Sequence, residues 1–351
     1  MILRNIYDKQ TLAKKIQEEK IPRVEISFYK YFPITEPQEF RNFLYKNLFE
    51  ISTLGRIYIA KEGINAQISI PETNIDSLRE FLDTIPELKD IRLNFAISSK
   101  QDAFLKLTIK VRKKIVHDGI EDQTFHPENS GTHLKPLEFH HALSDPETIV
   151  VDMRNNYEWE VGYFENAILP DADTFREELP MVENLLKDKK DKKILMYCTG
   201  GIRCEKASAY MKWKGFTNVF QLEGGIINYA NEIKKQGLES KFIGKNFVFD
   251  ERLGESVTEH VLGKCYTCET PTNDHTDCAN DACHALYLQC SACKEKFENC
   301  CSEDCQTVLH LDAEKQLAIR REEAKRRLES VGSHKPYTKR VRKEKLESSQ
   351  N

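Results

Sequence analysis

The sequence predicts an α/β protein made of three folded parts and a basic tail. Residues 24–111 alternate strand-like and helical patterns in the order βαββαβ, and residues 148–236 alternate short apolar runs with helical stretches. A third segment, 265–305, contains nine of the eleven cysteines. Since domains usually have about 100–200 residues, a chain of 351 residues is expected to hold more than one.

The first part, residues 1–116, is predicted to be a ferredoxin-like unit that begins with a short helix opened by Asp8. Strands are expected at 24–32, 55–60, 64–70 and 104–111, with helices at 37–49 and 75–82. This arrangement hosts many functions, so by itself it indicates none of them.

The second part is an α/β domain with a parallel sheet, predicted over 144–240 after a polar linker at 117–143. Its strands are expected at 148–152, 194–197 and 219–222, and its helices at 173–188, 203–214 and 225–236. A cysteine-rich module (241–311) and a charged tail (312–351) complete the chain; we expect a helix at 317–328 and disorder beyond Gly332.

The composition is that of a chain with buried cores, with 40% apolar and 31% charged residues. No apolar run approaches the roughly 18 residues needed to span a bilayer, and the first residues lack a signal-peptide pattern. We therefore expect a cytoplasmic protein with no membrane partner. The net charge of −4 combines a tail of +5 with a body of −9, which indicates either a polyanionic partner or a solvated tail.

The segment that carries chemistry runs from Tyr197 to Cys204, between a buried strand and a helix. The loop Cys198-Thr199-Gly200-Gly201-Ile202-Arg203 can turn its backbone N–H groups inward at the start of the helix. Such a cradle should lower the pKa of Cys198 and stabilise a thiolate or a persulfide, and Arg203 can pair with an anion held there.

The loop resembles that of rhodaneses, because cysteine phosphatases place one residue more between the cysteine and the arginine. Two flanking segments fit the same pattern: Asp152-x-Arg154 with Glu158, Gly162 and Ala167-Ile168, and Leu222-Glu223-Gly224-Gly225. The chain departs from it at 163–166, which puts only a local turn in doubt.

Three neighbours of Cys198 have alternative interpretations. Cys204 can be a small core residue or a second thiol that attacks a persulfide on Cys198. Asp152 and Arg154 are expected to brace the loop as an ion pair rather than to take part in chemistry.

The cysteine cluster has the spacing of metal sites. Cys265-x2-Cys268 and Cys290-x2-Cys293 lie about twenty residues apart, as in zinc ribbons. A second set can be formed by Cys278, Cys283, Cys305 and either Cys301 or Cys300. His275 and His284 are spare ligands. We expect one or two structural zinc ions, although the spacing leaves the pairing open and is compatible with metal-free thiols.

The whole order of parts resembles the rhodanese-domain tRNA uridine hydroxylases. The segments that carry the resemblance are 55–67, 154–158, 197–208 and 300–302. It implies tRNA as the partner rather than DNA, molecular oxygen as co-substrate, 5-hydroxyuridine at the wobble position as product, and Cys198 as an active-site cysteine that forms a persulfide. Two alternatives remain: a sulfurtransferase with a Cys198 persulfide, and a non-catalytic RNA-binding scaffold. The sequence leaves the oligomeric state open.

Overall fold

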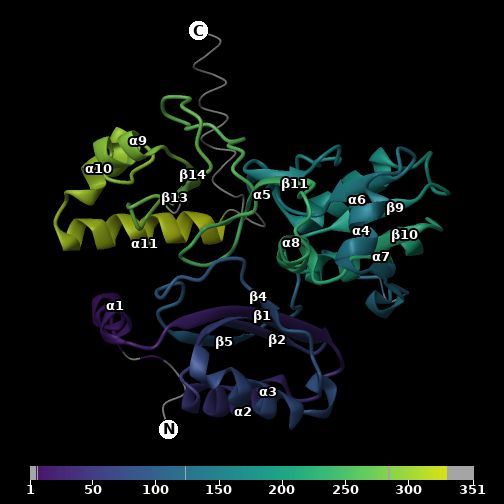
Figure 1. Cartoon of the computed structure of the whole chain (residues 1–351). Coiled ribbons are helices and arrows are strands. Elements are labelled where there is room, and N and C mark those ends of the chain that lie inside the picture. Colours follow the sequence, from purple (N-terminus) through teal and green to yellow (C-terminus); the bar gives the residue numbers. More distant parts are fainter. Residues whose placement is uncertain (1–4, 6, 123, 284, 330–351) are drawn as a thin grey trace.

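The structure is a computed structural model that describes residues 5, 7–122, 124–283 and 285–329 (Figure 1). The predicted disorder beyond Gly332 lies outside these residues. The strands between residues 23 and 111 form a five-stranded sheet in the order β4-β1-β3-β2-β5. Its elements are α1 (Lys9–Glu18), β1 (Arg23–Tyr31), α2 (Pro37–Glu50), β2 (Leu54–Ala60), β3 (Gly63–Pro71), α3 (Ile75–Asp83), β4 (Asn94–Phe95) and β5 (Leu107–Val111), with short 3-10 turns at Glu72–Asn74 and Pro86–Leu88.

Helices α2 and α3 cover one face of this sheet, while the other face is turned toward the rest of the chain (Figure 1). Alternate strand residues such as Ile57, Ile59 and Ile64 are fully buried against Leu44 and Leu48 of α2. This burial is the packing that the period-two pattern predicts. The residues between them point to the opposite face, which carries polar and aromatic side chains.

The predicted last strand of this unit lies at the other edge of the sheet from the one that a βαββαβ order implies. It forms β5, which pairs in parallel with β2, whereas the place beside β1 is taken by β4. Strand β4 has two residues, so it is too short to show an alternating pattern in the sequence.

The central domain is a parallel four-stranded sheet in the order β6-β10-β9-β7. Its elements are β6 (Thr132–Leu134), α4 (Pro136–Ala142), β7 (Ile149–Asp152), α5 (Asn156–Trp159), β8 (Gly162–Phe164), α6 (Phe175–Leu185), β9 (Ile194–Tyr197), α7 (Ile202–Trp213), β10 (Val219–Leu222) and α8 (Gly225–Lys235). The segment predicted as a linker thus contributes β6 and α4, after a 3-10 turn at Pro127–Asn129. Strand β6 is a partly exposed edge strand of three residues, which hides it in the polar sequence.

A small antiparallel sheet, β12-β11-β8, continues into the cysteine-rich module through β11 (Phe242–Asn246) and β12 (Glu255–Ser256). The module contains β13 (His275–Asp277), β14 (Leu286–Leu288), α9 (Ser291–Lys296), α10 (Glu303–Leu309) and α11 (Ala313–Glu329). Its apolar cores consist mainly of cysteines with Ala285 and Tyr287. Among the described helices, none is both long and apolar enough to cross a membrane.

Candidate active site

Cys198 lies in the loop between β9 and α7, where the chain leaves the parallel sheet. Cys198 is 1% exposed, and the backbone N–H of Gly201 donates a hydrogen bond to the Cys198 Sγ at 3.2 Å. Gly201 has a φ of +99°, a left-handed conformation that favours glycine. A Cβ atom there would also lie 2.8 Å from the hydroxyl of Tyr29, so both the turn and the close neighbour require glycine.

The loop makes Cys198 acidic. Burial alone would raise the pKa of the thiol, but the Cys204 thiol, the charge of Arg203 and backbone N–H groups of the helix start lower it to about 6. The pKa of Cys204 is raised well above 9 by its own burial and by its hydrogen bond to Cys198. Cys198 is therefore mainly a thiolate at neutral pH, and Cys204 is a thiol that donates to it.

Arg203 forms a buried, bidentate ion pair with Glu158 of α5. Its two terminal nitrogens lie 2.5 and 2.8 Å from the two carboxylate oxygens of Glu158, and the pair raises the pKa of Arg203 further above its ordinary range. The Arg203 side chain is 10% exposed and that of Glu158 is fully buried. The guanidinium is thus held in place beside Cys198. Sequence reasoning had assigned Glu158 to the rhodanese pattern without a partner.

Asp152 and Arg154 form a second buried ion pair. The guanidinium of Arg154 donates to both oxygens of Asp152, at 2.8 and 2.6 Å, and to the backbone oxygen of Gly162 at 2.6 Å. This arrangement ties the end of β7 to β8. The expected ion pair is present, and its role in bracing the Cys198 loop stays a prediction.

Glu178 is a functional candidate that sequence reasoning missed. Its side chain on α6 is fully buried, and neither carboxyl oxygen has a hydrogen-bond partner among the described residues. Burial raises its pKa well above 4.5, and the charge of Arg203 only partly opposes this effect. The Glu178 carboxyl group therefore keeps its proton to a higher pH than an exposed glutamate does. A glutamate at helical spacing among Phe175, Leu179 and Val182 was the available signal.

A cavity of about 300 Å³ separates the Cys198 loop from the open sheet face of the N-terminal domain. Cys198, Thr199, Gly200, Ile202 and Arg203 line one side of it. The other side is lined by residues from β1, β2 and β3. A volume of this size is at the lower end of the roughly 300–1,000 Å³ typical of small-molecule pockets, so it suits one compact group.

Helix α7 holds the two sides of the cavity together. Tyr29 donates to Glu205 at 2.9 Å, and Tyr31 donates to the backbone oxygen of Ile202 at 3.3 Å. Lys206, which is fully buried, lies 2.9 Å from Glu62 of the N-terminal domain and 2.6 Å from Asp118. The helix that begins at the reactive loop is therefore also one of the attachments of the N-terminal domain.

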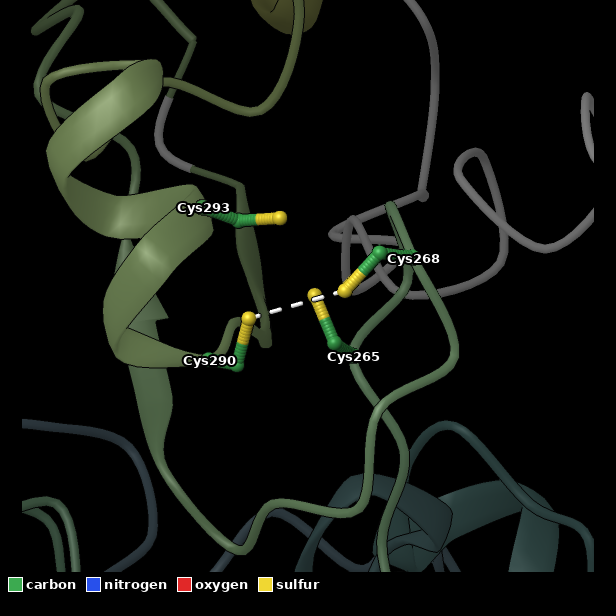
Figure 2. A group of neighbouring side chains, drawn as sticks. All are labelled: Cys265, Cys268, Cys290 and Cys293. Carbon is green, nitrogen blue, oxygen red and sulfur yellow. Dashed lines mark hydrogen bonds between the residues drawn. The ribbon is translucent and has the colours of Figure 1, made fainter.

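The cysteine-rich module brings its predicted ligands into two sets of four. Cys265, Cys268, Cys290 and Cys293 point toward one another from a loop and α9 (Figure 2). Their sulfur atoms all lie within 4.8 Å of one another, with 3.5 Å between Cys268 and Cys290. A tetrahedral zinc site with Zn–S bonds of about 2.3 Å needs sulfur atoms about 3.8 Å apart, so this set fits a metal ion.

The second set is Cys278, Cys283, Cys301 and Cys305, also within 4.8 Å of one another. Cys301 lies 3.6 Å from Cys283 and 3.5 Å from Cys305. Cys300 belongs to neither set, and His275 instead contacts the backbone oxygen of Tyr157. His284 lies outside the described residues. Two four-cysteine sites that can each hold a metal ion are therefore present.

Three family models match consecutive parts of the chain. They are described as a UPF0176 acylphosphatase-like domain (residues 23–115), a rhodanese-like domain (135–232) and a rhodanese C-terminal region (243–306). Together with the parallel sheet and the two cysteine sets, they confirm the predicted fold class.

Curated relatives extend the match to nearly the whole chain. Proteins named tRNA uridine(34) hydroxylase are 51% identical in Enterobacter sp. (strain 638), with 90% of each chain covered, and 51% identical in Leptospira interrogans, with 91% of this chain and 87% of the relative covered. The relative of that name from Photorhabdus laumondii is 50% identical, with 91% of each chain covered. The resemblance inferred from the sequence is confirmed: the chain belongs to the tRNA uridine(34) hydroxylase family.

Proposed function

We propose that the protein hydroxylates uridine 34 of tRNA to 5-hydroxyuridine, with Cys198 as the reactive group and molecular oxygen as co-substrate. The observation that carries the proposal is the position of Cys198. Its acidic thiol lines a cavity whose opposite wall belongs to the N-terminal domain. The cavity has the size for one compact group, as an enzyme that acts on a single unstacked base requires.

The chemistry that suits this thiolate is addition to C6 of the uracil ring. Addition makes C5 nucleophilic, so C5 can take up one oxygen atom. Loss of the C5 proton and cleavage of the C6–S bond then release 5-hydroxyuridine and restore the thiolate. One oxygen atom of O2 enters the product and the other becomes water, so the overall reaction consumes two electrons and two protons, which a thiol reductant supplies by becoming a disulfide.

A second candidate function is sulfur transfer through a Cys198 persulfide. The observation that favours it is the loop itself, because the N–H of Gly201 and the charge of Arg203 would stabilise the terminal sulfur anion as well as a thiolate. A non-catalytic scaffold is disfavoured, since a scaffold has no need of an acidic buried cysteine.

The cysteine-rich module serves as a structural support in this proposal. We assign one zinc ion to each set of four cysteines, because four thiolates satisfy zinc and leave no open position for catalysis. The eleven free cysteines favour a reducing compartment, and we place the reaction in the cytoplasm.

Nucleoside mass spectrometry tests the proposal. Purified protein and unmodified tRNA are incubated with a thiol reductant in air or under argon, beside the Cys198→Ser and Cys300→Ser variants. A mass gain of one oxygen on uridine that needs air and Cys198, and survives in Cys300→Ser, is the expected result. Sulfur on the RNA or on an added acceptor, without oxygen, would replace the hydroxylase with a sulfurtransferase.

A further inference from the structure

The cavity wall opposite Cys198 has an ordered pattern of side chains. On the open face of the N-terminal sheet, Asn65 of β3 pairs across the strands with Tyr29 of β1 and Tyr58 of β2. Two residues along β3, Gln67 pairs with Ser27 and Arg56. These two cross-strand rows all line the cavity, so each row has a side-chain amide at its centre.

The two amides have no other task within the described structure. Neither Asn65 nor Gln67 forms a side-chain hydrogen bond to any described residue, although both are half-buried. The nearby Ser27 hydroxyl is buried without a partner as well. The Ser27 hydroxyl is removed from water, and such groups are normally paired, whereas the amide atoms of Asn65 and Gln67 stay accessible. All three side chains line the cavity and are available to a ligand held there.

The rows lie directly below the reactive loop. A Cβ atom on Gly200 would be 3.8 Å from the Ser27 hydroxyl oxygen, and one on Gly201 would be 2.8 Å from the Tyr29 hydroxyl. A molecule held by the amides is therefore within one ring width of the loop that carries Cys198.

We propose that Asn65 and Gln67 bind the O4–N3–O2 edge of an extruded uracil base. This inference rests on the proposed function and names the groups that position its substrate. A side-chain amide offers one donor and one acceptor, which match a ring carbonyl and the adjacent N3–H, and the second amide can donate to the other carbonyl. Tyr29 and Tyr58 stand on either side of Asn65, on strands about 9.6 Å apart, so that a tyrosine ring can stack on one face of the base while the other face stays open to Cys198.

The ring geometry connects this binding to the chemistry. In uracil, C5 and C6 lie on the side of the ring opposite to N3. If the sheet holds the N3 edge, the C5–C6 bond is turned toward the cavity side lined by Cys198. Asn65 and Gln67 are thus positioning residues, which act by presenting the reacting carbons to the thiolate.

The test combines protein and RNA variants in a double-mutant cycle. An anticodon stem-loop RNA carries uridine or 3-methyluridine at position 34, and the latter lacks the N3–H donor. The proteins are the wild type, Asn65→Ala, Asn65→Asp, Gln67→Ala and the control Gln38→Ala, an exposed amide on α2 at the other face of the sheet. Affinity is measured by fluorescence anisotropy, and product formation by nucleoside mass spectrometry.

With the uridine RNA, each alanine variant of the pocket should lose roughly 10- to 100-fold in kcat/KM, the effect of one lost hydrogen bond at a buried site. Asn65→Asp, which keeps the size but loses the donor, should lose activity similarly, and Gln38→Ala should match the wild type. The 3-methyl group should weaken binding to the wild type at least tenfold but weaken binding to Asn65→Ala much less. Unchanged activity in both alanine variants, or fully additive effects of the methyl group and Asn65→Ala, would overturn the inference. An inactive wild type would instead refute the proposed function.

Discussion

Replacing Cys204 with alanine should raise the pKa of Cys198. The Cys204 thiol is fully buried and donates to the Cys198 thiolate, and it is the first of the groups that lower the Cys198 pKa to about 6. A hydrogen bond to a charged group contributes about 1.5–3 kcal/mol, and about 1.4 kcal/mol moves a pKa by one unit. The pKa of Cys198 in Cys204→Ala should therefore lie between about 7 and 8.

The measurement is the rate of alkylation by iodoacetamide between pH 5 and pH 9. Because the thiolate reacts and the thiol does not, the rate follows the ionised fraction of Cys198. At pH 6.5 this fraction falls from about three quarters at a pKa of 6 to between a quarter and a thirtieth, so the rate should fall roughly 3- to 25-fold. Trypsin cleaves after Lys193 and Arg203, which leaves Cys198 as the only cysteine in its peptide and lets mass spectrometry follow it alone.

Cys204→Ser is the matched control. A serine hydroxyl also donates a hydrogen bond but cannot form a disulfide, so its alkylation profile should stay close to that of the wild type. An identical profile for Cys204→Ala and the wild type would refute the hydrogen bond. Equal shifts of the Cys198 pKa in Cys204→Ala and Cys204→Ser would show that the Cys204 sulfur lowers this pKa by something other than a donated hydrogen bond.

Three further predictions concern metal binding and buried charge. Cys268→Ser should lower the zinc content by one ion per chain in plasma mass spectrometry, whereas Cys300→Ser, outside both sets, should keep the wild-type content. Lys206→Met should lower the free energy of unfolding in urea by about 1.5–3 kcal/mol, because it removes a charge-assisted hydrogen bond from the buried Asp118, which keeps Lys114 as a partner; the exposed Lys212→Met should change it by less than about 0.5 kcal/mol. Glu178→Gln should gain stability relative to the wild type as the pH rises above 4.5, because the raised pKa of Glu178 makes the folded wild type retain a proton that the unfolded chain releases. A constant difference between pH 5 and pH 8 would show that Glu178 is ionised in the folded protein.

The sequence was sufficient for the elements that have a long repeating pattern. The apolar runs of β7, β9 and β10 and the helices that follow them lie within a few residues of their predicted bounds. Two-residue and three-residue strands such as β4 and β6 could not be found, because so few residues show no periodicity.

At the site, local motifs were predictable and long-range partners were not. The loop and the first set of four cysteines follow from spacing along the chain, whereas the spacing left the choice between Cys300 and Cys301 open in the second set, which the structure completes with Cys301. The ionic partners of Arg203 and Lys206, by contrast, lie 45 and 144 residues away from them, at Glu158 and Glu62. Only the packed fold brings such residues together. The role of Cys198 stays a prediction that the experiments above test.

The contacts that α7 of the central domain makes with the N-terminal domain decide what a shorter fragment of the chain would lose. A rhodanese-like unit cut out at its own boundaries would keep the sulfur loop but lose Tyr29, Asn65 and Tyr58, and its Lys206 would be left without Glu62. In such a fragment the cavity beside Cys198 would be open on the side that β1, β2 and β3 line in the full chain. On the proposed function, the central domain supplies the reactive cysteine and the N-terminal domain supplies the opposite wall of the cavity, so a change of substrate would require changes in both domains.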